Sequence, residues 1–323
     1  MIEDFWQGML FAGNIIFPLI ALIWIGRWLR MSGQIREQFL QDVNALLYRY
    51  GIPGLLFFSI LKSQESLMSQ WRLVAAGYLA TYLLYLVSSL IANKMIASPA
   101  DRGVFVQGVF RGNLAILGLA FVIQAHGDYG REVGGILAGA IALELNVLSV
   151  ICLNKAMQQQ TEFSAWQSMM QLLKKMLQNP LIIAILCGFF LKILHVPLPK
   201  AVFSFGDLFT RLTLPLSLIS IGAAFDLRGI FGAGQMAVWA SVGRLLVSPL
   251  CFLCCGLLLG LTGRDLAILC LMGAVPAANA GYIMAKALGG NAIAAANIIA
   301  ITTAASLLVV APLIALFYAL DWV

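Results

Sequence analysis

The chain has 323 residues, of which 61% are hydrophobic and only 11% are charged. Charged residues make up about a quarter of an ordinary soluble domain, so this composition excludes one and predicts an all-α polytopic membrane protein. The net charge of +6 fits the positive bias of cytoplasmic loops better than nucleic-acid binding.

Roughly ten apolar runs are long enough to cross a bilayer, and short connections join them. The longest connection, 156–178, is amphipathic and is expected to lie along the cytoplasmic membrane surface as a linker. It separates a first repeat, 1–155, from a second repeat, 179–323. The apolar runs cover residues 9–29, 41–61, 71–93, 104–126, 132–154, 180–195, 203–225, 233–261, 265–289 and 292–320.

The two halves resemble each other at an offset of 162 residues. The tripeptide PLI at 18–20 recurs at 180–182, and the motif Arg-x-x-x-Pro that begins at Arg49 recurs at Arg211. Each of these arginines is expected to donate to a backbone carbonyl that the following proline frees. Because five helices is an odd number, the second half must insert upside down. Inverted repeats of this kind are typical of secondary transporters.

Lysine and arginine favour one set of alternate loops, which we expect to be cytoplasmic. Both termini are then expected on the outer side of the membrane. The richer set of loops contains Arg27, Arg30, Arg36, Lys94, Arg102, Lys155, Lys174, Lys175 and Arg228.

The run 104–126 is interrupted by Arg111, Gly112 and Asn113. Glycine permits unwound backbone, so Gly112 is expected to break this helix. In the next run, 132–154, Glu144 is an intramembrane carboxylate, which is by default a functional hypothesis. We expect Glu144 to carry a coupling proton or cation, or alternatively to form a structural salt bridge with Arg111 or Arg244.

The corresponding segment of the second half, 270–290, contains Pro276, Asn279 and Lys286. Pro276 has no N–H, so the helix is expected to break there, which lipid tolerates only inside protein or beside a watery cavity. Asn279 then lies in the first turn of a second half-helix, where unpaired N–H groups collect. Lys286 could neutralise substrate charge or extend to the interface. A merely kinked structural helix is the alternative.

In inverted repeats the two broken helices would cross near the midplane and bring Asn113 and Asn279 together. Two amide side chains and two opposed half-helix N-termini suit a carboxylate. The sequence therefore predicts a substrate site at this crossing, with Gly112 and Pro276 at the breaks and Arg111 as a candidate charged contact.

The sequence contains little that indicates an enzyme active site or a metal site. Cys251, Cys254 and Cys255 have no histidine or carboxylate near them, and His126 and His195 lie near segment ends. A membrane-embedded enzyme would need a convergent acid–base pair, a nucleophile or a metal cluster. We expect no enzyme activity, no cofactor and no metal site. A channel is disfavoured because the polar residues cluster at one level instead of lining a continuous pathway.

The chain contains the motifs YGIPGLLFFSIL, FRGNLAILGLA, LELNVLSV, NPLIIAILCGF, LTLPLSLISIGAAF and VPAANAGYIMAKALGGN. Together they resemble the auxin efflux carrier family, which includes the plant PIN-FORMED carriers and bacterial relatives associated with malonate, malate and similar acids. The resemblance implies ten helices in two inverted five-helix repeats, with helices 4 and 9 broken and crossed. It also implies a dimerising scaffold of helices 1, 2, 6 and 7, and a core of helices 3–5 and 8–10 that moves like an elevator.

By motif match, the resemblance implies that Asn113 and Asn279 contact substrate, that Pro276 is the crossover proline and that Asn146 is the family's fifth-helix asparagine. Gly112 stands where the family has a proline, which leaves the geometry of the first crossover open. The short central loop points to a bacterial-type member in the inner membrane.

The sequence thus predicts a secondary active transporter of a small organic anion, such as malonate, malate or an auxin-like acid. A sodium-coupled symporter or an ion antiporter of the same architecture is the alternative, and a membrane-embedded enzyme is disfavoured. The expected partners are the anion, protons or sodium, the bilayer and a second copy of the chain.

Overall fold

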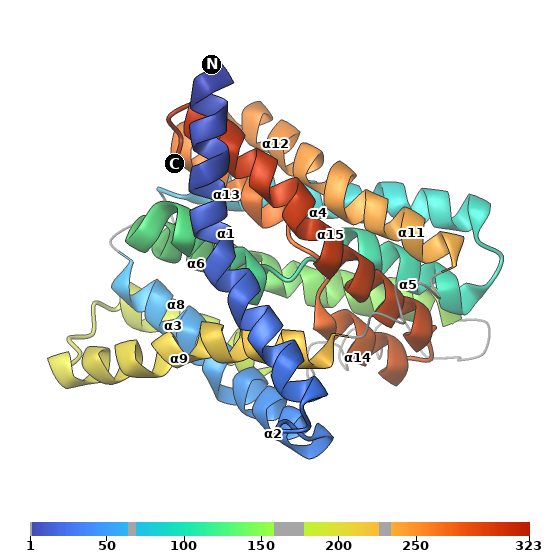
Figure 1. The fold of residues 1–323 in the computed structure, drawn as a ribbon, viewed down its shortest axis with the longest axis horizontal. Coiled ribbons are helices and arrows are strands. Elements are labelled where there is room, and N and C mark those ends of the chain that lie inside the picture. The colour runs from blue at the N-terminus through green and yellow to red at the C-terminus, as the bar shows by residue number, and fades with distance from the viewer. Residues whose placement is uncertain (1, 64–68, 158–177, 226–233) are drawn as a thin grey trace.

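The computed structural model describes residues 2–63, 69–157, 178–225 and 234–323, and these are helical apart from their connections (Figure 1). Their β-type pairing is a single isolated bridge between Gly112 and Ala277. Within these ranges, seven helical segments are long and apolar enough to cross a membrane, and Pro180–Ile193 is a shorter apolar helix. The prediction of a polytopic all-helical membrane protein is confirmed.

Proline and glycine explain where the helices begin, bulge and bend. The π-helical turns η1 (Leu47–Gly51) and η3 (Gly243–Val247) are each followed two residues later by a proline, Pro53 or Pro249. A proline cannot donate to the carbonyl four residues before it. Helix α6 (Leu119–Met157) contains a sharp kink at Gly127, whose φ of 62° favours glycine.

In the first half of the chain the elements are α1 (Ile2–Met31), α2 (Glu37–Leu46), η1 (Leu47–Gly51), α3 (Ile52–Lys62), α4 (Trp71–Met95), α5 (Pro99–Phe110), η2 (Leu114–Gly118) and α6 (Leu119–Met157). In the second half they are α8 (Pro180–Ile193), α9 (Lys200–Ala224), α11 (Gln235–Val242), η3 (Gly243–Val247), α12 (Ser248–Leu258), α13 (Gly263–Gly273), α14 (Asn279–Ala287) and α15 (Ala292–Ala319). Most of the predicted linker 156–178 lies outside the described residues.

The short helices α5 and α13 lie in the interior of the protein. Every residue from Gly103 to Phe110 and from Leu266 to Gly273 is buried. A helix that is apolar on all sides is stable only when protein or lipid surrounds it, and here protein does. Both helices end in the interior, so the chain breaks that follow them are enclosed by protein.

A second group of contacts joins α1 with α9 and α3 with both α8 and α9. Helices α1 and α9 meet backbone to backbone, because a methyl group on Gly26 would overlap the backbone of Ile219, and one on Gly222 would overlap that of Ile23. Helix α1 also packs along α15, where Gly8 lies against the backbone of Ala315. Both chain termini lie at the same end of the molecule (Figure 1).

We expect Gly26→Ala to lower the melting temperature of the detergent-purified protein, because the added methyl group must push α1 away from α9. Overpacking of this kind costs about 1–3 kcal/mol. Gly13→Ala in the same helix is the matched control, since a methyl group there meets nothing within 4 Å. Equal melting temperatures for the two variants would contradict the close approach of the helices.

Candidate functional site

Two interruptions lie where the sequence predicts them. Helix α5 ends at Phe110 and helical structure resumes at Leu114, which leaves the first break at 111–113. Helix α13 ends at Gly273 and α14 begins at Asn279, so the second break contains Pro276. Asn279 occupies the first position of the second half-helix, as expected.

The two breaks pair with each other through the backbone. The N–H of Asn113 donates to the carbonyl of Pro276 at 2.8 Å, and the N–H of Ala278 donates to the carbonyl of Arg111 at 3.0 Å. Gly112 fits this crossing because a Cβ atom there would lie 2.8 Å from a methyl carbon of Val275. The close approach of the two chains explains why glycine is found at this position.

Arg244 joins the ends of the two interior helices. Its side chain is fully buried and donates to the carbonyls of Val109 and Phe110 at 3.2 and 2.9 Å, at the end of α5. It also donates to the carbonyl of Gly273, at the end of α13, and to Ser248 Oγ at 2.6 Å. A cation is stabilised at helix C-termini, where unpaired carbonyls and the negative end of the dipole coincide.

Sequence reasoning considered Arg244 only as a salt-bridge partner for Glu144 and missed this role. The available signal is an arginine within an apolar run, followed one turn later by Ser248. That signal indicates a buried cation but does not identify the carbonyls that it contacts.

Arg111 anchors the first break to the second part of α6. Its guanidinium donates to the carbonyl of Leu145 and to Ser149 Oγ, both at 2.8 Å, and to Asn146 Oδ1 at 3.0 Å. Asn146 in turn donates to the carbonyl of Ala142. The structure therefore brings together two predicted site residues, Arg111 and Asn146, whose contact the sequence did not indicate.

Glu144 lies on α6 one turn after Ala140, whose carbonyl accepts a hydrogen bond from the hydroxyl of Tyr78. In the described part of the chain, one carboxyl oxygen of Glu144 is buried and has no hydrogen-bond partner. The salt bridge to Arg111 or Arg244 that we considered as an alternative is not found among the described residues. Glu144 is thus an intramembrane carboxyl group with one buried oxygen that accepts no hydrogen bond from the described residues.

The two predicted asparagines differ in exposure. The side chain of Asn113 is buried, whereas Asn279 is exposed, and no hydrogen bond joins the two side chains in the described residues. In the described part of the chain, the N-cap residues of the two half-helices, Asn113 and Ala278, make no capping hydrogen bond through a side chain. In α14 the N–H of Gly281 donates to the carbonyl of Ala278, and the N–H groups of the first turns that have no such partner are available to a ligand. Lys286 is exposed near the end of α14.

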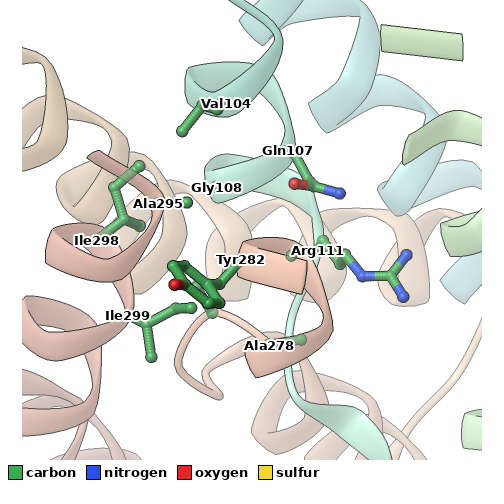
Figure 2. Close-up of a pocket in the computed structure, with 11 residues that line it drawn as sticks. Val104, Gln107, Gly108, Arg111, Ala278, Tyr282, Ala295, Ile298 and Ile299 are labelled. Atoms are coloured by element: carbon green, nitrogen blue, oxygen red, sulfur yellow. The ribbon is translucent and has the colours of Figure 1, made fainter. Parts of the chain in front are cut away.

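A pocket lies beside the crossing, between α5, α14 and α15 (Figure 2). Gln107, which is 3% exposed and which sequence reasoning missed, contributes a side-chain amide to its wall. Figure 2 shows the guanidinium of Arg111 directed away from Tyr282. Only about 10 Å³ of the pocket admits the centre of a water molecule, which is room for about one water. Binding of an organic solute here requires the walls to separate.

Long apolar helices, with paired breaks enclosed in the interior, define a multi-pass membrane protein of the transporter class. The chain belongs to the family described as membrane transport protein, whose model matches residues 12–314, and this is the auxin efflux carrier family. The resemblance inferred from the sequence is confirmed. The family is one of membrane transporters and not of enzymes. A search of curated proteins gives no significant match.

We expect Arg244→Met to lower the melting temperature strongly, by an amount equivalent to about 3 kcal/mol or more, because several buried carbonyls lose their donor. The exposed Arg264 provides a matched control in Arg264→Met. The melting temperatures of the two variants are compared in detergent by intrinsic fluorescence, and only Arg244→Met is expected to show the loss. If both variants melt like the parent, Arg244 does not stabilise the ends of α5 and α13 as described.

Proposed function

We propose that this transporter carries a small organic anion, and that the paired breaks form its substrate site. The observation that carries the proposal is the meeting of two half-helix N-termini without side-chain caps beside Asn113 and Asn279. Unpaired N–H groups and positive dipole ends together favour a carboxylate. In this site Asn113 and Asn279 bind the anion, while Gly112 and Pro276 allow the chains to cross.

The proposed architecture is two inverted five-helix repeats, 1–155 and 179–323, and reciprocal contacts support it. Asp101, in the first turn of α5, accepts a hydrogen bond from Asn291 at 2.7 Å. Asp265, in the first turn of α13, accepts one from the hydroxyl of Tyr129 at 2.6 Å. Positions 129 and 291 are 162 residues apart, which is the offset of the sequence repeat.

The turns before these contacts support the same assignment. Gly127 and Gly289 are also 162 residues apart, and both have a positive φ, of 62° and 80°. Each glycine follows the second half of a broken segment. Two residues after it comes the donor to the aspartate of the other segment, Tyr129 for Asp265 and Asn291 for Asp101. In the proposed repeat, each broken segment is thus fastened at its start to the end of the other.

We assign α1–α3, α8 and α9 to a scaffold, and α4–α6 and α11–α15 to a transport core that moves against it. The small volume of the pocket at the crossing supports movement, since an organic solute fits there only when the surrounding helices shift. The packing of α1 along α15 then acts as the contact across which the two units slide or pivot.

We propose Glu144 as the carrier of the coupling ion, with the proton favoured over sodium. Its carboxyl oxygen without a partner supports this role, because a protonated carboxyl is far cheaper to hold in a membrane than a charged one. Lys286 is assigned to the cytoplasmic interface and Arg111 to holding the first break.

The remaining proposals concern assembly and orientation. We propose a homodimer formed through the scaffold, whose large exposed apolar side chains include Phe17, Trp24 and Leu208. In a bilayer such side chains contact lipid or a second copy of the chain. Both termini are assigned to the periplasmic side of a bacterial inner membrane, from the lysine and arginine bias of the loops.

The first test is uptake into proteoliposomes of radiolabelled malonate, malate, succinate, lactate and an indole acid. We expect saturable uptake of one acid, reduced about tenfold or more in Asn279→Ala because the variant loses a hydrogen bond to the anion. Asn14→Ala, at an exposed position in α1, is the matched control. Uptake at the parental rate in Asn279→Ala would exclude the crossing as the substrate site.

The second test concerns coupling. We expect Glu144→Gln to abolish the stimulation of uptake by an inward proton gradient while exchange of the same acid across the membrane continues, because glutamine cannot carry a proton. Glu132→Gln serves as the control. Gradient-driven uptake that persists in Glu144→Gln removes this residue from coupling, and stimulation by sodium in place of protons favours the symporter alternative.

A further inference from the structure

A second cavity lies apart from the crossing, between the scaffold and the first part of α6. Its volume is about 210 Å³, and its walls come from α1, α3 and α9 on one side and from residues 120–131 on the other. None of the predicted substrate-site residues lines it. The volume is below that of most drug-sized ligand sites, so it suits a small molecule.

One part of this cavity is hydrocarbon. The side chains that form it come from three scaffold helices and from α6, and none of them carries a polar group. They include Leu19, Leu22, Leu55, Leu214, Leu218 and Ile123. This wall favours a ligand with an apolar body and disfavours a compact, fully hydrated ion.

The other part of the cavity is polar and carries a positive excess. Asp207 forms an ion pair with Lys62, which neutralises its charge. Arg131 lies opposite on α6 and pairs with the largely exposed Asp128 at 2.9 Å. Arg211 lies one turn after Asp207 and has no ion-pair partner among the described residues.

The sequence predicted that Arg211 donates to a carbonyl freed by Pro215, but no such hydrogen bond is found in the described part of the chain. Arg211 is exposed and lines the cavity instead. Its guanidinium attracts Asp207 electrostatically but forms no ion pair among the described residues, and its planar fork of donors suits a carboxylate.

We propose that this cavity is a second anion-binding site, specific for a small carboxylate with an aliphatic body. Arg211 anchors the carboxylate, Arg131 adds positive potential, and the leucine wall accepts the hydrocarbon part. The inference rests on the cavity alone and does not depend on which solute is transported, because it concerns equilibrium binding.

The test is isothermal titration of the full chain in detergent with 4-methylpentanoate, and with the neutral 4-methylpentanamide as a control ligand. We expect the acid to bind and the amide not to bind. Arg211→Gln should weaken binding about fivefold or more, as loss of a charge-assisted pair does. Arg49→Gln, the corresponding exposed arginine of the first half, should leave the affinity unchanged.

Leu22→Phe provides an independent variant in the hydrocarbon part of the cavity. The larger ring fills the cavity, so this variant should weaken binding while Arg211 is intact. Melting curves show that each variant is folded. The proposal is overturned if the folded parent does not bind the acid, if the amide binds equally well, or if Arg211→Gln retains the parental affinity. A negative result in the uptake assay does not change any of these binding outcomes. The failure of the proposed second site can therefore be distinguished from the failure of the proposed transport function.

Discussion

A membrane helix can be broken only where protein satisfies the backbone groups that the break releases, and the rest of this structure depends on that constraint. Arg244 meets it for both interior helices, by donating to carbonyls at the ends of α5 and α13. The hydrogen bonds between the breaks satisfy the backbone N–H groups of Asn113 and Ala278, and the hydroxyl of Thr302 accepts from the N–H of Ala277. The C-terminal ends of the first half-helices are thus occupied, whereas in the described part of the chain the N-cap residue of neither second half-helix makes a capping hydrogen bond through its side chain.

This asymmetry connects structure with function. Arg111 and Arg244 bring two positive charges into the interior, and neither contacts a carboxylate among the described residues. Their hydrogen bonds go to carbonyls, hydroxyls and the amide of Asn146, so the positive charge is spread but not cancelled. Unpaired N–H groups at the two half-helices add to the same potential. An anion that entered the crossing would supply the missing negative charge, and this balance supports the proposal of an anionic substrate.

The sequence predicted the features that are local. Gly112 and Pro276 are visible as breaks because glycine and proline act on their own backbone, and Asn279 follows as the start of a half-helix. The contacts of Arg244, the link from Arg111 to Asn146 and the cavity beside Arg211 could not be predicted. The link from Arg111 to Asn146 and the hydrogen bonds from Arg244 to backbone carbonyls join positions 29 to 135 residues apart. The cavity depends on how helices from both halves pack. The hydrophobic periodicity of a single segment predicts none of these contacts. The prediction for Arg211 went wrong for the same reason, because a neighbouring proline indicates a free carbonyl but not the donor.

In the proposed mechanism the core carrying the crossing moves against the scaffold, and a distance measurement tests this movement directly. Spin labels at the exposed positions Leu208 on α9 and Ile283 on α14 report across the two units, and a pair at Ile283 and Leu258 on α12 reports within the core. Distances are measured in lipid nanodiscs with and without the acid that the uptake assay identifies, after replacement of the native cysteines. The account predicts that the acid shifts the distance distribution of the first pair and leaves the second unchanged. An unchanged first pair under saturating acid would contradict movement of the core.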